Sequence, residues 1–416
     1  MTTRSTSDMG LLNAFQWQGS GKVYSLPWLK NRLEYSSDPG RIAEYGKAPF
    51  TRSRFVMKML TEFHLSRNSI VVSDDIHAAR LRRISRTHIP QEEDIPNIAR
   101  DVMERVFSNL GSGKGEQRIH ISDRLIRELY RVMLENMLGV TILKPLDDYI
   151  TRTKFPQGSR PMVLEGVMYS FRLHLPILRP IRYMIDRLFF KKTLYMKRVS
   201  DTLVQMVCDF TISKPDSLFS TLVELRVSGK ITRAQFRGEI NSMLVSSFSL
   251  ASALGSALLC LAARPQYQKK IHDDPAFAKQ FTMEVLRLYP PFRQFGYEKI
   301  TQEGVSCPFG SAGHEFMISV PALHRNSNVW KNPHKFYPER FLDPREMGGL
   351  KYLPFGMGKR ACLGRRFSMS MIEQALRFVC SDENQISLVK RSTLPRGRSG
   401  HLVSFALDDT LAYRAR

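Results

Sequence analysis

The run from Ile240 to Ala263, INSMLVSSFSLASALGSALLCLAA, contains no charged side chain and constrains the fold more than any other segment. It is long enough either to cross a bilayer as a helix or to form the buried centre of a helical domain. Six serines and one asparagine lie within it, and it stands alone in the middle of the chain. This composition favours the buried helix, so we expect a mainly helical protein built around residues 240–263.

The rest of the chain fits that expectation. Its 416 residues are 43% hydrophobic, enough for a large core, and they show no internal repeat, low-complexity tract or linker. Helical periodicity dominates, and short strands are predicted in the first 60 residues, over 297–322 and over 402–407. We predict a mainly α fold with minor β sheets, in a single domain spanning residues 1–416.

The chain is strongly basic, because 62 Lys and Arg residues against 39 Asp and Glu residues give a net charge of +23. A basic surface attracts nucleic acid, anionic lipid or an acidic protein. The sequence has no zinc-finger spacing and no RNA-binding aromatic signature, which argues against nucleic acid. An acidic protein partner and a membrane surface both remain open.

The sequence shows neither a targeting signal nor a disulfide framework. Residues 1–25 contain no apolar core of a signal peptide and no anchor helix. The five cysteines are widely spaced and form no C-x-x-C pair, so no structural zinc site is indicated. We therefore expect a cytoplasmic protein without a transmembrane anchor.

Residues 161–198 are apolar, aromatic and basic, and prolines at 176 and 180 divide them into two predicted helices. One interpretation is a lid that meets an apolar substrate or a membrane surface. The other is a packed helix pair with a solvated basic face. The sequence alone does not choose between them.

The segment FGMGKRACLG, residues 355–364, places one cysteine among three glycines directly before a predicted helix over 364–379. Glycine lets the backbone bend tightly and approach a flat partner, and a helix N-terminus with Lys359 and Arg360 nearby favours the thiolate of Cys362. On chemistry alone two readings stay open: a metal-binding thiolate beneath a large cofactor, and a buried structural cysteine. A nucleophilic cysteine is less favoured because no neighbouring histidine offers a base, although His324 lies elsewhere in the chain.

The same segment matches the pattern F-x-x-G-x-R-x-C-x-G of the cytochrome P-450 family at Phe355, Gly358, Arg360, Cys362 and Gly364. A pattern with several residues at set gaps is highly specific. The chain therefore resembles the haem-thiolate cytochromes P-450 from about residue 70 to the C-terminus, least over 100–235. This resemblance implies the cytochrome P-450 fold.

Further segments match the family in the same order. EVLR supplies an E-x-x-R pair, Glu284 and Arg287, on one helix face. FYPERF supplies Arg340, which in this family completes a buried ion network with that pair. The surrounding stretch, residues 323–343, resembles the segment that leads to the haem loop.

The resemblance implies a role for each matching residue of the loop. Cys362 resembles the axial thiolate ligand of the iron in haem b, iron protoporphyrin IX. Phe355 resembles the aromatic side chain that shields the sulfur, Arg360 resembles a donor to a haem propionate, and Gly364 completes the cofactor-binding loop. In ARLRRIS, Arg82 resembles a second propionate donor.

One position beside Arg82 departs from the family. The usual Trp or His four residues earlier is replaced by Ala78. A shift of one residue would bring His77 into that role, so His77 is a candidate cofactor-binding residue.

The central helix also departs from the family, whose pattern [AG]-G-x-[DE]-T-[TS] provides an acid and an alcohol that relay protons. With the register anchored on LAARP, 261–265, the matching residues are Val245–Leu250. Phe248 then replaces the acid and Ser249 replaces the threonine, which leaves Ser249 as the candidate catalytic hydroxyl.

Small side chains gather on one face of the same helix. This face suits a flat cofactor that lies close, or tight packing of a second helix, and we favour the cofactor. Its members are Ser242, Ser246, Ser249, Ala253 and Ser256.

Together the matches predict a monooxygenase that inserts one oxygen atom from O2 into an apolar or mixed small molecule of the secondary-metabolite type. Electrons would come from a separate acidic ferredoxin or flavodoxin that docks near Cys362 on the basic surface. Because Phe248 cannot carry a proton, a haem-thiolate isomerase, dehydratase or peroxygenase is the alternative. A non-catalytic haem sensor is the alternative from another class.

Overall fold

The computed structural model of the chain describes the elements that carry the site. It covers residues 22–25, 32–47, 50–52, 76–108, 117–154, 180–181, 184, 187–188, 191–299, 315–346, 349–381, 384–388, 397–399, 404–406 and 410–415.

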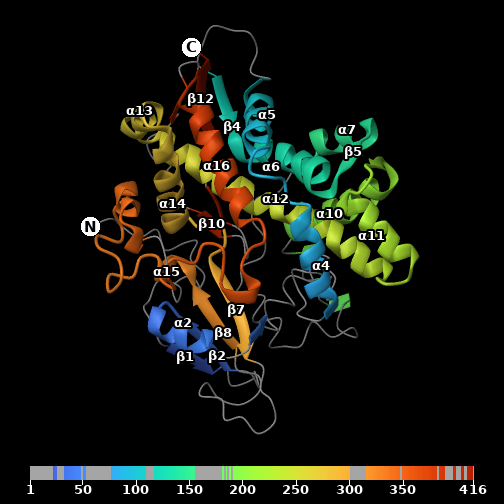
Figure 1. The fold of residues 1–416 in the computed structure, drawn as a ribbon, viewed down its shortest axis with the longest axis horizontal. Coiled ribbons are helices and arrows are strands. Elements are labelled where there is room, and N and C mark those ends of the chain that lie inside the picture. Colours follow the sequence, from blue (N-terminus) through green and yellow to red (C-terminus); the bar gives the residue numbers. More distant parts are fainter. Residues whose placement is uncertain are drawn as a thin grey trace.

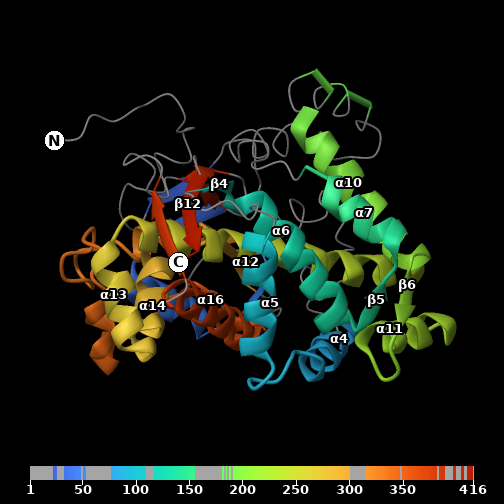
Figure 2. The same ribbon diagram turned by 90° about the horizontal axis from the view of Figure 1, so that it is seen from above.

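One long helix, α12 (Arg233–Ala262), runs through the middle of the helical part in both views (Figures 1 and 2). Its 30 residues span about 45 Å at the usual rise per residue. A capping box starts it: the Thr232 hydroxyl accepts from the Gln235 amide at 3.2 Å, and the Gln235 side chain accepts from the Thr232 amide at 2.7 Å. The helix therefore begins earlier than the uncharged run that predicted it.

The surroundings of α12 decide between the two readings of that run. Within the described residues, α12 alone has the length and apolarity of a membrane span, and 78% of its most apolar window is buried inside the protein. The prediction of a buried central helix is thus confirmed.

Most of the remaining elements are helices. They are α2 (Pro39–Gly46), α4 (Ile76–Thr87), α5 (Ile95–Ser108), α6 (Ile121–Val132), the π-helix η1 (Met133–Leu138), α7 (Lys144–Arg152), α10 (Lys191–Asp209), α11 (Leu218–Val227), α13 (Pro265–Asp273), α14 (Ala278–Leu288), α15 (Val320–Leu323), α16 (Arg365–Val379), and the 3-10 helices η3 (Pro275–Phe277), η4 (Pro338–Leu342), η5 (Pro344–Glu346) and η6 (Gly358–Arg360). Among them α6, α14 and α16 contact α12, whereas α2 lies beside a five-stranded sheet (Figure 1).

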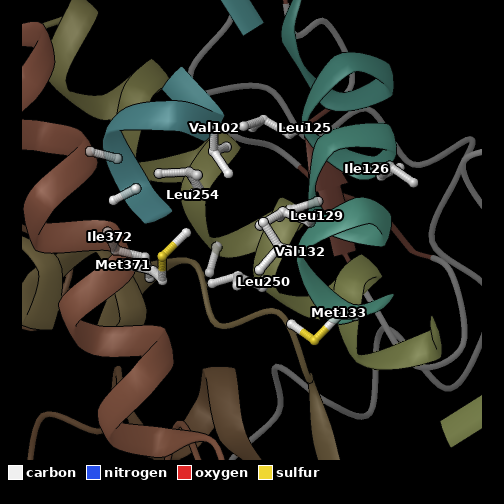
Figure 3. Close-up of a cluster of buried hydrophobic side chains, with 14 of the residues drawn as sticks. Val102, Leu125, Ile126, Leu129, Val132, Met133, Leu250, Leu254, Met371 and Ile372 are labelled. Atoms are coloured by element: carbon white, nitrogen blue, oxygen red, sulfur yellow. The ribbon is translucent and has the colours of Figure 1, made fainter. Parts of the chain in front are cut away.

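The main core lies where α5, α6, α12 and α16 meet. Figure 3 shows their apolar side chains converging, with Val102 of α5, Leu129 of α6, Leu254 of α12 and Met371 of α16 among them. Leu129, Leu254 and Met371 are completely buried. Burial of such side chains is the dominant stabilising term in a fold of this kind, and it fixes α16, whose N-terminus follows the cysteine loop.

The strands form small sheets beside the helices. A five-stranded sheet has the order β1-β2-β8-β7-β3, with β2 and β8 parallel and the other pairs antiparallel, and it lies below the helices in Figure 1. A three-stranded antiparallel sheet has the order β4-β12-β9, and β5-β6 and β10-β11 are antiparallel pairs. The strands are β1 (Lys22–Ser25), β2 (Arg32–Ser36), β3 (Phe50–Arg52), β4 (Gln117–His120), β5 (Val140–Ile142), β6 (Thr211–Ser213), β7 (Gln294–Lys299), β8 (Glu315–Ser319), β9 (Asn384–Leu388), β10 (Gly397–Ser399), β11 (Ser404–Ala406) and β12 (Thr410–Ala415).

The prediction of a mainly α fold with minor β sheets is confirmed by these elements. Helix α2, in contrast, falls in a part of the sequence that suggested only irregular structure and short strands. Asp38 starts α2, because its carboxylate accepts from the Gly40 amide at 2.9 Å.

Most of the predicted lid or helix pair over 161–198 lies outside the described residues. Four apolar side chains that are described there are exposed: Ile181 (45%), Met184 (55%), Leu188 (62%) and Tyr195 (43%). Both interpretations of this segment stay predictions.

Candidate functional site

The loop over residues 355–364 is folded back on itself before α16. The Cys362 amide donates to the Phe355 carbonyl at 2.9 Å, which closes the loop. Gly356 (φ 73°) and Gly358 (φ 56°) both adopt the left-handed conformation that other residues avoid. The turn thus favours glycine at Gly358, which the motif fixes, and at Gly356, where the motif allows any residue.

Cys362 lies near the start of α16, where the Gly364 amide donates to its sulfur. The cysteine is exposed, although protein surrounds it closely enough for desolvation to be the main influence on its pKa. The cysteine side chain is therefore accessible to a bound partner, although nearby protein groups desolvate its sulfur.

The charge around Cys362 differs from the sequence-based expectation. Burial raises the pKa of the Cys362 thiol above its ordinary value, and the Gly364 amide and the positive charge of Arg82 counteract this only in part. The direction of this pKa shift is opposite to the stabilised thiolate that the sequence-based expectation gave to the loop. Desolvation outweighs the Gly364 amide and the charge of Arg82, which are the opposing influences on the sulfur.

Arg82 reaches the loop from α4, far away in the sequence. Its Nη2 donates to the Ala361 carbonyl at 2.9 Å, one residue before the cysteine. Arg360 is buried within the loop at 7% exposure, whereas Lys359 is exposed. The structure thus brings Arg82 and Arg360 together at the cysteine loop. The side chain of His77 lies outside the described residues.

Two members of the predicted small-residue face of α12, Ser246 and Ser249, are among the few open positions in the middle of that helix. Between Gly238 and Ala262, Ser246 is exposed, Met243, Val245 and Ser249 are half-buried, and every other residue is buried. Ser249 donates its hydroxyl to the Ser246 carbonyl at 2.8 Å, and Ser246 donates to the Met243 carbonyl at 2.5 Å. These hydroxyls stand on an accessible surface that a bound molecule can reach.

Phe248 lies on a different face of α12. It is 8% exposed and meets Tyr130 of α6 edge to face, with 5.7 Å between ring centroids. The neighbouring Ser247 donates to the Leu129 carbonyl at 3.3 Å, again toward α6. The aromatic contact occupies the position that the family gives to an acid, so no carboxylate accompanies Ser249 there.

Glu284 and Arg287 of α14 form a fully buried ion pair. Arg287 donates to both carboxylate oxygens, at 2.7 and 2.9 Å, and Arg340 of η4 approaches the same carboxylate at 3.2 Å. The Glu284 carboxylate also accepts from the Tyr337 amide at 2.7 Å. The structure thus brings together the three residues of the predicted network.

The two arginines of this network also bind the backbone that precedes the cysteine loop. Arg287 donates to the carbonyls of His324, Pro333 and Lys335 at 2.6 to 3.1 Å. Arg340 donates to the carbonyl of Lys331 at 2.8 Å. The network therefore holds an irregular segment in place through charge-assisted bonds.

His324 was the distant candidate base for a nucleophilic Cys362, and the structure excludes that role. The side chain is fully buried, and both ring nitrogens contact backbone groups, at 2.9 and 3.0 Å. Sequence reasoning did not foresee these contacts, because nothing in the local pattern around His324 marks them.

Comparison with known proteins gives the chain its relatives. The family model "Cytochrome P450" matches residues 18–379. A bifunctional cytochrome P450/NADPH–P450 reductase 2 of Bacillus subtilis is 28% identical over 225 residues, which cover 47% of this chain and 21% of that protein. A (+)-menthofuran synthase of Mentha piperita is 36% identical over 111 residues, covering 25% of this chain and 22% of that protein.

Among solved structures, the crystal structure of CYP175A1 from Thermus thermophillus is similar over most of its length. The TM-score is 0.64 at 19% identity, and the match covers 95% of this chain and 91% of the other. This likeness confirms the predicted fold. The sequence relatives match over only about a fifth of their own length.

Proposed function

The chain belongs to the cytochrome P450 family, and from this membership we propose that it is a haem-thiolate monooxygenase. It would insert one oxygen atom from O2 into an apolar or mixed small molecule, such as a secondary metabolite. The observation that carries the proposal is the exposed Cys362 in the family's cysteine loop, which is closed by the bond from the Cys362 amide to the Phe355 carbonyl. The matched relatives, whose names include a P450 reductase fusion and a menthofuran synthase, support oxidative chemistry.

The residues at the site fit haem b. The Cys362 sulfur is accessible, and as a thiolate it would be a soft ligand for a haem iron. Arg82 and Arg360 supply positive charge next to it for the haem propionates. The half-buried Phe355 ring is part of the same loop. The residues present are thus a sulfur ligand and two arginines at the same loop, a set that suits haem b.

Each group has a task in the proposed reaction. When bound, thiolate-ligated haem supplies the iron that activates dioxygen and favours cleavage of the O–O bond. Cys362 would bind the iron, and Arg82 and Arg360 would orient the cofactor through its propionates. The accessible face of α12 would border the reacting molecules. The Ser249 hydroxyl would be the proton-donating group on that face, because no carboxylic acid lies beside it in the described part of the chain.

A turnover assay tests this proposal directly. The purified protein is supplied with O2, NADPH and surrogate ferredoxin and flavodoxin systems, after a spectral binding screen of a metabolite library has identified ligands. Oxygenated product that carries one atom from labelled O2 supports the proposal. Ligand binding without consumption of reductant under any of these conditions contradicts it.

The substitution Ser249→Ala should separate reductant use from product formation. We expect unchanged haem content and ligand affinity, less product per NADPH consumed and more hydrogen peroxide released. The reason is that reduced oxygen leaves as peroxide when no positioned hydroxyl directs the proton, and one such group typically contributes about 10²–10⁴-fold. Product and peroxide are both quantified against NADPH oxidation. Ser256→Ala, on the same face but buried, is the control, and unchanged coupling in Ser249→Ala would argue against the assignment.

A basic surface around the cysteine loop supports the proposed acidic electron donor. Exposed Lys359, Arg365 and Arg366 lie on the loop and the start of α16, and exposed Arg83 and Arg86 lie on α4, which contacts the loop through Arg82. Positive charge here would steer an acidic ferredoxin or flavodoxin toward the haem.

Reversing this charge should weaken the association of the protein with its electron donor. In the variant Lys359→Glu/Arg366→Glu we expect slower reduction by an acidic plant-type ferredoxin and a weaker dependence on ionic strength, because such charges act mainly on the association rate. Stopped-flow reduction at several salt concentrations measures both quantities. Lys230→Glu/Lys269→Glu, at exposed positions outside the loop and α4, controls for net charge. Equal slowing in both variants would contradict docking at the loop.

The packing of Phe248 favours a second candidate function. An aromatic side chain held against Tyr130 cannot deliver a proton, and rearrangement or dehydration of an oxygenated substrate does not need that delivery. Conversion of a hydroperoxide without NADPH or a reductase would support this isomerase or dehydratase reading.

For both candidate functions we propose that the protein is located in the cytoplasm.

A further inference from the structure

The buried His324, which directly follows α15, joins the end of α14 to the segment that enters the cysteine loop. His324 Nδ1 lies 3.0 Å from the Arg287 carbonyl, and the Leu353 amide lies 2.9 Å from His324 Nε2. A carbonyl can only accept and an amide N–H can only donate. The ring is therefore the neutral tautomer with its proton on Nδ1, bonded at both ends.

The first of these bonds satisfies a carbonyl that the helix itself cannot use. In a longer helix the Arg287 carbonyl would accept from the residue four positions later, but that residue is Pro291 and has no N–H. His324 supplies the missing donor, and the adjacent Arg325 donates to the next carbonyl, that of Leu288. Burial lowers the pKa of His324 to about 3, which keeps the ring in the required neutral form.

The second bond acts on the segment that enters the cysteine loop. Leu353 is two residues before Phe355, whose carbonyl accepts from the Cys362 amide. The preceding residue, Tyr352, stacks on the histidine ring at 5.3 Å and donates its hydroxyl to the Met283 carbonyl of α14 at 3.0 Å. The entrance of the loop is thus bonded to α14 through His324 and Tyr352.

From this geometry we propose that His324 is a positioning residue for Cys362: it joins the end of α14 to the Leu353 amide and so holds the cysteine at the depth where its sulfur binds the cofactor. The inference rests on the proposed haem-thiolate function. It assigns His324 no contact with substrate or haem. Without the Leu353 bond, the loop entrance would move and thiolate ligation would become incomplete.

The test compares the share of thiolate-ligated haem with the thermal stability of each variant. His324→Phe keeps a ring on Tyr352 but removes both hydrogen bonds, and Val140→Ala, a buried position in β5, destabilises the fold elsewhere. The reduced, CO-bound spectrum of each haem-loaded protein gives the share of thiolate-ligated haem from its red-shifted Soret band, and thermal unfolding gives the midpoint. We expect His324→Phe to lose most of the red-shifted band and Val140→Ala to keep it.

A second pair of variants keeps the proposal testable if His324→Phe does not fold. His324→Gln retains an acceptor near Nε2 for the Leu353 amide, whereas His324→Asn retains a donor near Nδ1 for the Arg287 carbonyl. We expect a larger share of thiolate-ligated haem in His324→Gln than in His324→Asn, because the bond to the Leu353 amide positions the loop.

The positioning role of His324 would be overturned if His324→Phe kept the red-shifted band at wild-type intensity. It would also be overturned if Val140→Ala, at the same unfolding midpoint as His324→Phe, lost an equal share of thiolate-ligated haem. A share of thiolate-ligated haem in His324→Asn that equals or exceeds that in His324→Gln would contradict it as well. Failure of the proposed function looks different, because the wild-type protein itself would then lack the red-shifted band.

Discussion

Cys362→Ser will abolish the red-shifted Soret band of the reduced, CO-bound protein. A serine hydroxyl is a far weaker ligand than a thiolate, so the iron loses the donor that shifts the band. The loss of the red-shifted band should be complete, because residues 355–364 contain no cysteine other than Cys362. Haem content and the CO difference spectrum are measured together, so that lost haem and lost thiolate ligation are told apart.

Cys380→Ser is the matched control. Cys380 is buried at the end of α16, and burial raises the pKa of its thiol to about 12, so it remains a neutral core side chain. The variant should keep the red-shifted band at wild-type intensity. A required Cys380 together with a dispensable Cys362 would show that the loop assignment is wrong.

Arg287→Ala should yield very little folded, haem-loaded protein. The substitution leaves the Glu284 carboxylate at 0% exposure with Arg340 as its remaining cationic partner, and it removes the donors to three backbone carbonyls. Removing one partner from a buried pair typically costs about 3–5 kcal/mol, which is a large part of the stability of an ordinary domain. Soluble yield, haem content and the denaturant midpoint measure the loss.

An exposed ion pair provides the comparison for that variant. Arg345 pairs with Asp343 at 2.8 Å, but its side chain is 90% exposed. Solvent screens such a pair, so Arg345→Ala should express and load haem like the wild-type protein. If Arg287→Ala behaves in the same way, the buried network does not carry the fold.

Local patterns predicted the features that depend on neighbouring residues. The glycine turn follows from residues 355–364, and the pairing of Glu284 with Arg287 follows from their spacing of three on one helix. The uncharged composition of 240–263 predicted a buried helix in the same way. The roles of Ser249, Arg82 and Arg360 in chemistry stay predictions.

Features that depend on distant residues were predictable only where the family resemblance supplied them, as for Arg340 and Glu284. The His324 bonds join residues 29 and 37 positions apart, and nothing near His324 signals either partner. The direction of the Cys362 pKa shift was wrong for a related reason. Nearby charges can be read from the sequence, whereas desolvation depends on how much of the folded protein surrounds the sulfur.

The bond between Arg82 and the Ala361 carbonyl also has a consequence during synthesis, because its partners are 279 positions apart. A ribosome adding about 5–20 residues per second needs roughly 15–60 seconds to make the intervening chain. Helix α4, with its run of arginines, therefore emerges long before the loop that it contacts. The nascent protein cannot make this contact until Ala361 has been synthesised and has left the ribosome, so α4 waits a long time for its partner in the cysteine loop.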